Sequence, residues 1–125
     1  MLSSARSSIF LATTKATEAQ DFYTNLLGLK FVEDNEFALV FHMAGAELRI
    51  SKVAEFMPQP FTVLDWQVSD IKSAVAEMKN KGISFVTYDF MEQDEDGIWT
   101  VPNDSTKIAW FKDPDNNVLS ISQRS

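Results

Sequence analysis

The chain repeats one pattern twice, and this repeat constrains the fold more than any other feature. Segments 14–32 and 69–86 each contain a hydroxyl residue, an amphipathic helical stretch, a glycine and a strand-like run that includes Phe-Val. The two hydroxyl residues are 69 − 14 = 55 positions apart, and the two glycines are 82 − 28 = 54 apart. Duplicated units usually pack together, and ligands tend to bind in the cleft that such units form. We therefore expect a duplicated fold with a ligand cleft.

Each repeat extends into a unit of five elements. In the first unit the pattern predicts a strand over 8–13, a helix from Thr14 to Gly28, and strands over 30–33, 37–43 and 47–53. The second unit has a strand over 62–68, a helix from Ser69 to Gly82, and strands over 83–88, 107–112 and 118–122. The sequence therefore predicts an α+β fold in one domain, 1–125, made of two tandem β-α-β-β-β modules. We place the modules at about 7–55 and 62–123, joined by a linker over 56–61 that contains two prolines.

The second repeat carries an acidic insertion between positions 87 and 106. Five carboxylates precede Trp99 in this segment, and no regular apolar pattern runs through it. A long structureless insertion in a compact domain is often a lid or a binding loop. A charged run is also often a solvated loop without function, and this alternative remains open. A single Trp in an acidic loop favours a role at a binding site, so we include Trp99 among the predicted ligand-binding residues.

Charge and composition exclude several classes of partner. The 125 residues include 11 basic and 18 acidic side chains, for a net charge of −7. Phosphate contacts need clustered Lys and Arg, so we expect neither nucleic acid nor a membrane surface as partner. There is no cysteine, which excludes thiolate chemistry and suits the cytoplasm. No run reaches the roughly 18 apolar residues of a membrane span. A neutral or cationic small molecule is the expected partner.

Several short motifs resemble one known superfamily. Asp21–Leu29 reads DFYTNLLGL, Trp110–Asn117 reads WFKDPDNN, Trp66–Ile71 reads WQVSDI and Asp96–Ile98 reads DGI. Together with the module order, they resemble the glyoxalase, bleomycin-resistance and extradiol-dioxygenase proteins, also called the vicinal oxygen chelate superfamily. The chain looks closest to the small uncharacterised bacterial members. The resemblance implies a curved, barrel-like mixed sheet with helices outside, and a homodimer. The superfamily includes lyases, dioxygenases, epimerases and antibiotic-binding proteins, so fold alone does not determine function.

The chemistry of that superfamily usually rests on a divalent metal held by His and Glu residues. Matching the motifs places the four ligand positions at Ser8, Arg49, Val63 and Ser120. A guanidinium repels a cation and a valine offers no lone pair, so these are not metal ligands. The chain has a single histidine, His42, which excludes a two-histidine site within one chain. We therefore predict no metal and no cofactor, with a metal-dependent enzyme as the less favoured alternative.

Strand alternation identifies the side chains that should line the cavity. Successive residues of a strand point to opposite faces, and the former ligand positions mark the inner face. Leu48, Ile50, Leu64, Trp66, Leu119 and Ile121 then form the core. The predicted inward set is Ser8, Phe10 and Ala12; Glu47, Arg49 and Ser51; Val63, Asp65 and Gln67; and Val118, Ser120 and Ser122. The residues predicted to bind a ligand are Arg49, Glu47, Asp65, Gln67, Ser8, Ser120 and Trp99.

Three functions fit this cavity. The leading hypothesis is a metal-free protein that binds a small organic molecule, such as an antibiotic or a toxin that it sequesters. The second is an enzyme without metal, in which Arg49 stabilises an oxyanion and Asp65 or Glu47 moves a proton. A non-catalytic interaction module, with the cavity filled by its own side chains, is the third. An internal salt bridge from Arg49 to Asp65 or Glu47 is compatible with all three, since buried charges are normally paired.

Overall fold

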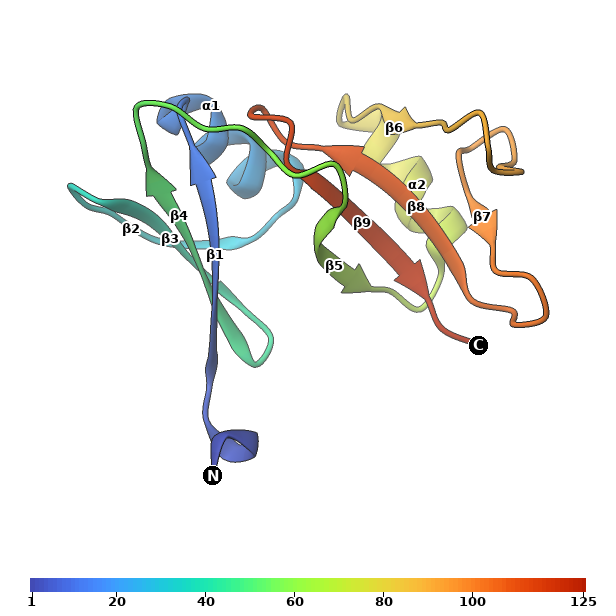
Figure 1. Ribbon diagram of the computed structural model, residues 1–125, viewed down its shortest axis with the longest axis horizontal. Helices are drawn as coiled ribbons and strands as arrows, with labels where there is room; N and C mark the ends of the chain where they lie inside the picture. The colour runs from blue at the N-terminus through green and yellow to red at the C-terminus, as the bar shows by residue number, and fades with distance from the viewer. The chain divides into compact units, whose positions relative to one another are not determined.

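The strands form two separate sheets in a computed structural model that describes residues 1–125 (Figure 1). The chain divides into two units, Met1–Met57 and Pro58–Ser125, and each unit contains one sheet. The strand and helix order in each unit matches the predicted β-α-β-β-β module, with one extra short strand in the second. The predicted α+β class with two tandem modules is therefore confirmed. Neither sheet closes on itself into a barrel.

The first unit is a four-stranded sheet with a short helical segment. Its strand order is β1-β4-β3-β2, with β1 parallel to β4 and the other neighbours antiparallel. The elements are η1 (Leu2–Ser4), β1 (Ser7–Thr13), α1 (Ala16–Asp21), the π-helix η2 (Phe22–Leu26), β2 (Lys30–Asp34), β3 (Ala38–Met43) and β4 (Ala46–Lys52).

Alternation along β4 separates the core of the first unit from its other face. Leu48 and Ile50 are fully buried, and Phe41 on β3 packs against Tyr23 of the helical segment with ring centroids 5.7 Å apart. Glu47 and Arg49 alternate with these β4 core residues in sequence and are half-buried on the opposite face. The predicted core positions of β4, Leu48 and Ile50, are therefore confirmed, and that Glu47 and Arg49 line a cavity stays a prediction.

The second unit repeats this topology around a longer helix. Its strand order is β5-β9-β8-β6, with β5 parallel to β9 and β7 pairing with the far end of β8 (Figure 1). Phe111 and Leu119 form the centre of its core, together with Ile71 and Val75 of the helix. The elements are β5 (Thr62–Gln67), α2 (Ile71–Asn80), β6 (Phe85–Val86), β7 (Trp99–Thr100), β8 (Lys107–Lys112) and β9 (Val118–Gln123). No helix in the structure combines the length and the apolar character needed to cross a membrane.

Both helices begin one or two residues later than the sequence predicts. In the first unit the N-cap is Lys15 and makes no capping bond with its side chain, while the Thr13 hydroxyl accepts from the Lys15 amide at 2.9 Å. In the second unit the cap is Asp70, whose carboxylate accepts from the Ser73 amide at 3.2 Å. A charged oxygen at a helix N-terminus is a stronger acceptor than a hydroxyl, which explains the choice of Asp70 over Ser69.

The cap at Asp70 gives a pH-dependent contribution to stability. Hydrogen bonds from the Ser73 amide and hydroxyl favour the charged form and hold the Asp70 pKa below its ordinary value of 3.8. A carboxyl whose pKa falls on folding stabilises the protein above the unfolded pKa, and this is lost as pH falls through the folded pKa. Asn also caps helices but does not titrate. On acidification below about pH 4, we therefore expect the melting temperature of Asp70→Asn to fall less than that of the wild type. Asp89→Asn, at an exposed position outside the helix, is the control, and equal curves for the two variants would contradict the expectation.

Candidate functional site

Six predicted or aromatic side chains share one face of the second sheet. Cross-strand partners point to the same face, so the register defines rows of neighbours. One row runs from Asp65 through Ser120 to Trp110, and the next runs from Gln67 through Ser122 and Ile108 to Trp99. We call this surface the Asp65 face and define it by Asp65, Gln67, Ser120, Ser122, Trp99 and Trp110. One half is polar and the other half aromatic.

Asp65 is held by hydroxyl groups that lie beneath it. Its Oδ1 accepts from the Ser120 hydroxyl at 2.6 Å, and its Oδ2 accepts from the Ser122 hydroxyl at 2.7 Å. Both serines are almost fully buried, at 3% and 1% exposure. Arg124, just beyond β9, brings a guanidinium nitrogen within 3.7 Å of Oδ2 and stays largely in solvent. The carboxylate is thus fixed in position while a quarter of the side chain remains open.

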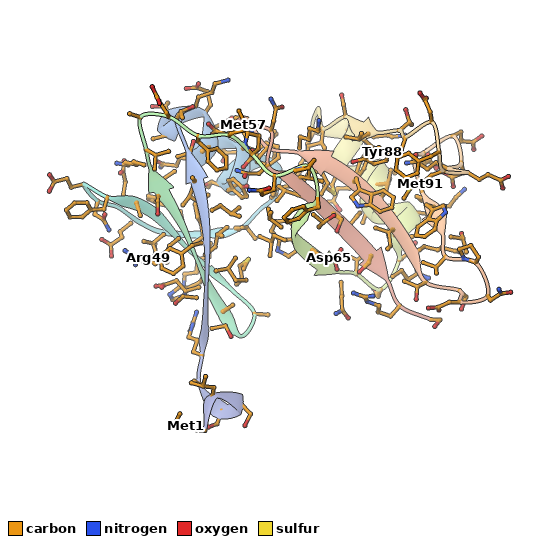
Figure 2. The ribbon with its side chains drawn as sticks, viewed as in Figure 1. Met1, Arg49, Met57, Asp65, Tyr88 and Met91 are labelled. Carbon is orange, nitrogen blue, oxygen red and sulfur yellow. The ribbon has the colours of Figure 1, made fainter.

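The aromatic half is an interlocked cluster on β7, β8 and the segment after β6. Trp110 donates its indole N–H to the Thr62 hydroxyl at 3.0 Å, which fixes the plane of the ring. Tyr88 meets Trp110 edge to face with ring centroids 5.7 Å apart, and Trp99 lies 6.1 Å from Trp110. Figure 2 labels Asp65 near β5 and β9 and Tyr88 near β6, the strand at the other edge of this sheet. Such rings offer flat apolar surface to a ligand at little cost in side-chain entropy.

The alternation predicted for β5 is wrong at its first residues. The register of β5 against β9 shifts between Thr62 and Leu64, which is a bulge at Val63. A bulge adds one residue to a strand and moves the residues before it to the other face. Thr62, rather than the predicted Val63, therefore faces Trp110. Asp65 and Gln67 lie beyond the bulge and keep the predicted orientation.

Three of the predicted site residues come together in the first unit. Ser8 on β1 donates its hydroxyl to Glu47 on β4 at 3.1 Å, and a guanidinium nitrogen of Arg49 lies 3.8 Å from the same carboxylate oxygen. Both charged side chains keep about 30% of their surface exposed, since the values are 31% and 29%. The salt bridge from Arg49 to Glu47, one of the two that the sequence left open, is therefore present. His42 is the cross-strand neighbour of Glu47 and is exposed.

The donor set does not fit the divalent metal of the resembled superfamily. No group of three or more His, Cys, Asp or Glu side chains is placed to hold a metal ion. Two of the four positions have other roles, because Arg49 pairs with Glu47 and the Ser120 hydroxyl donates to Asp65. A hydroxyl that donates to a carboxylate and a guanidinium are both poor ligands for Mg²⁺, Zn²⁺ or Fe²⁺.

The acidic insertion is ordered, contrary to the structureless segment that the sequence predicts. Gln93 accepts from the Tyr88 amide at 2.7 Å and donates to the carbonyl oxygens of Val86 and Gly97, each at 2.9 Å. The segment contains β7, and Gln93 also forms a bridge with Trp99. An amide side chain carries both donors and an acceptor, so one Gln can replace several backbone pairs of a regular strand.

Three residues that support the candidate site escaped the sequence prediction. Arg124 continues the alternation of Ser120 and Ser122 past the end of β9, so extending that pattern by one step would have found it. Thr62 was hidden by the bulge, for which the sequence has no clear signal. Gln93 was hidden because its partners are backbone atoms, which leave no pattern in the sequence.

Comparisons with known proteins agree on the fold. A family model described as the Glyoxalase/Bleomycin resistance protein/Dioxygenase superfamily matches residues 7–121. The chain is similar in structure to TnmS3, an antibiotic binding protein from Streptomyces sp. CB03234, with a TM-score of 0.73 and 20% identity over 100% of this chain and 99% of that one. A lactoylglutathione lyase from Agrobacterium tumefaciens gives a TM-score of 0.71 and 14% identity over 96% and 93%.

A third similar structure is a glyoxalase/bleomycin resistance protein/dioxygenase from Nocardioides, with a TM-score of 0.73 and 15% identity over 96% of this chain and 83% of that one. No curated protein matches the chain in sequence. Identities this low show only that the fold is shared. They do not show that this chain binds the ligand of any of these relatives. The family model covers nearly the whole length, and the motifs that suggested the resemblance lie within it. The chain therefore belongs to the Glyoxalase/Bleomycin resistance protein/Dioxygenase superfamily.

Proposed function

We propose that the chain binds a small organic molecule on the Asp65 face, without a metal and without chemical conversion. The observation that carries the proposal is the division of this face into a fixed carboxylate with its serines and a cluster of indole rings. Small-molecule sites typically combine apolar surface with a few well-placed polar groups. The polar part of the guest would contact Asp65 and Gln67, and its flat part would stack on Trp110 and Trp99.

The comparison with an antibiotic binding protein supports the same class of guest, because TnmS3 shares the fold over the full length of the chain. The net charge of −7 also favours neutral or cationic guests through long-range attraction. Sequestration of an antibiotic or a toxin is the role that these features suit best. A homodimer and a cytoplasmic location stay predictions that accompany this proposal.

Native mass spectrometry of the purified protein, combined with elemental analysis, tests the proposal directly. We expect no stoichiometric transition metal and a small organic mass that stays bound in the gas phase. If no mass is retained, a library of aromatic antibiotics is screened by the fluorescence of the three Trp residues. A stoichiometric transition metal, or a protein with no retained mass and no response to the library, would contradict the proposal.

Trp110→Leu separates stacking on the Asp65 face from general effects on the fold. We expect it to weaken binding of the guest identified above by about tenfold, because an aromatic pair contributes roughly 0.5–1.5 kcal/mol beyond its apolar area. Trp66→Leu is the matched control, since Trp66 faces the core and stacks on Phe111 at 6.3 Å. Isothermal titration of both folded variants measures the difference. Equal losses of affinity would argue against the Asp65 face as the binding surface.

An enzyme without metal is the second candidate, and the pair of Arg49 and Glu47 favours it. A half-exposed guanidinium beside a carboxylate can hold an oxyanion and exchange a proton. Asp65 suits the proton-transfer role less well, because both of its oxygens already accept a hydrogen bond from a serine. Conversion of the retained compound by the wild type, lost in Arg49→Met, would favour this candidate over pure binding.

A further inference from the structure

The acidic insertion lines an open cavity of its own, next to the Asp65 face. The cavity has a volume of about 640 Å³ and is bordered by the stretches 90–94 and 98–102. Its apolar wall consists of Phe90, Met91, Ile98, Trp99 and Pro102, and its acidic wall of Glu92 and Asp94. No Lys, Arg or His side chain lines it. Trp99 is the only residue that it shares with the Asp65 face, so a ligand here would not contact Asp65.

The cavity is preformed by hydrogen bonds within the insertion. The Oδ1 of Asp94 accepts from the amides of Asp96 and Ile98, at 2.8 and 2.9 Å, which closes a tight turn around Gly97. Gly97 has a φ of +84°, and a Cβ there would lie 3.3 Å from the Phe85 side chain. The Gln93 side chain ties the other end of the turn to the backbone at Val86. A wall fixed in this way need not be ordered when a ligand binds.

The exposed groups of the cavity indicate the chemistry of its ligand. Phe90 is 80% exposed, which makes it the most exposed phenylalanine of the chain. Glu92 has no ion pair in the structure, whereas Asp96 in the same insertion is neutralised by Lys79 at 3.1 Å. Aromatic faces attract cations electrostatically, and a neighbouring carboxylate adds to that attraction. We propose that this cavity binds a small organic cation of the quaternary-ammonium class, held between the rings of Phe90 and Trp99 and the carboxylate of Glu92.

Choline and its uncharged isostere 3,3-dimethyl-1-butanol test this proposal by NMR. The chain has three Trp residues, so three indole N–H signals are expected and can be assigned with single Trp→Phe variants. We expect choline to shift the Trp99 signal, with a dissociation constant on the order of a millimolar, as befits a partly exposed cation site. The isostere has the same shape and should bind at least fivefold more weakly. Equal affinity of the two compounds, or an unmoved Trp99 signal, would overturn the proposal.

Two variants of equal charge separate local contact from the general field of the insertion. Glu92→Gln and Asp89→Asn each remove one negative charge from this segment, but only Glu92 lines the cavity. We expect Glu92→Gln to weaken choline at least threefold and Asp89→Asn to change it by less than twofold. Equal losses of choline affinity in the two variants would mean that only the general negative charge attracts choline, and would overturn the proposed contact with Glu92.

The signals also separate this site from the proposed function. If choline shifts the Trp110 signal rather than the Trp99 signal, and Asp65→Asn abolishes that shift, the proposed site in the cavity of the acidic insertion is overturned and the Asp65 face is supported. Shifts that are confined to the Trp99 signal and unaffected by Asp65→Asn support the site in the cavity of the acidic insertion, whatever guest the Asp65 face binds.

Discussion

Asp113→Ala is expected to lower the free energy of unfolding by about 4 kcal/mol, the largest effect of any single substitution proposed for this chain. The Asp113 carboxylate is 5% exposed and accepts hydrogen bonds from the amides of Asp115 and Asn117, each at 2.9 Å, and from the Asn117 side chain at 2.7 Å. These bonds close the turn between β8 and β9. Alanine would leave several buried donors without this acceptor, and each such donor costs roughly 1–3 kcal/mol.

Urea unfolding followed by Trp fluorescence measures the loss as a lower midpoint with an unchanged slope. Asp113→Asn is the informative companion, because its amide oxygen can still accept from the two backbone amides while its NH₂ group would face the donor of Asn117. We expect a loss between those of the wild type and the alanine variant. Glu95→Ala, at an exposed position in the insertion, should change stability by less than about 0.5 kcal/mol. A loss below about 1 kcal/mol for Asp113→Ala would mean that water replaces the carboxylate in the turn.

Much of this fold is predictable from the sequence because its strands follow a local rule. The alternation of β4 places Leu48 and Ile50 in the core and Glu47 and Arg49 opposite, and a buried apolar face leaves only one register open to such a strand. The turn before β9 was likewise predictable, since Asp and Asn residues bond their own backbone two or more positions onward. These features depend on neighbours in the sequence.

The remainder depends on contacts between distant segments. The bulge at Val63 is an adjustment of β5 to β9, and it moved Thr62 onto the face where Trp110 needs an acceptor. Ser120 and Ser122 could be predicted to point inward. It could not be predicted that both hydroxyls would donate to one carboxylate, which lies 55 and 57 residues earlier in the chain. The shared face of these residues was thus predictable, but the network of bonds between them was not.

The order of the acidic insertion was also beyond what the sequence alone predicts. Its composition resembles a solvated loop, and only the three hydrogen bonds of the Gln93 side chain reveal why it is ordered. Those partners are backbone atoms of Val86, Tyr88 and Gly97. The bonds therefore do not depend on the side chain at position 86, and at position 88 they require only a residue other than proline. Gly97 is the exception, because its positive φ favours glycine.

Asp65→Ala is expected to lower the free energy of unfolding by about 3 kcal/mol, because two buried hydroxyl donors lose their acceptor. Ser120 and Ser122 are sealed beneath the carboxylate, whereas Arg124 is exposed and loses little from the missing ion pair. Urea unfolding again provides the measurement. A loss below about 1 kcal/mol would show that the hydroxyls find other acceptors and that the carboxylate is not fixed by them.

Two further variants separate the structural role of Asp65 from its role in binding. Removing both hydroxyls as well, in Asp65→Ala with Ser120→Ala and Ser122→Ala, should restore most of the stability, because a hydrogen-bonded group replaced together with its partners is nearly neutral. Asp65→Asn keeps an acceptor for one serine and offers its NH₂ group to the hydroxyl oxygen of the other. It should therefore stay folded with the charge removed. If the guest of the Asp65 face is cationic, Asp65→Asn lowers the affinity for the guest while the stability changes little. If the guest is neutral, Asp65→Asn leaves the affinity nearly unchanged, whereas Trp110→Leu still lowers it.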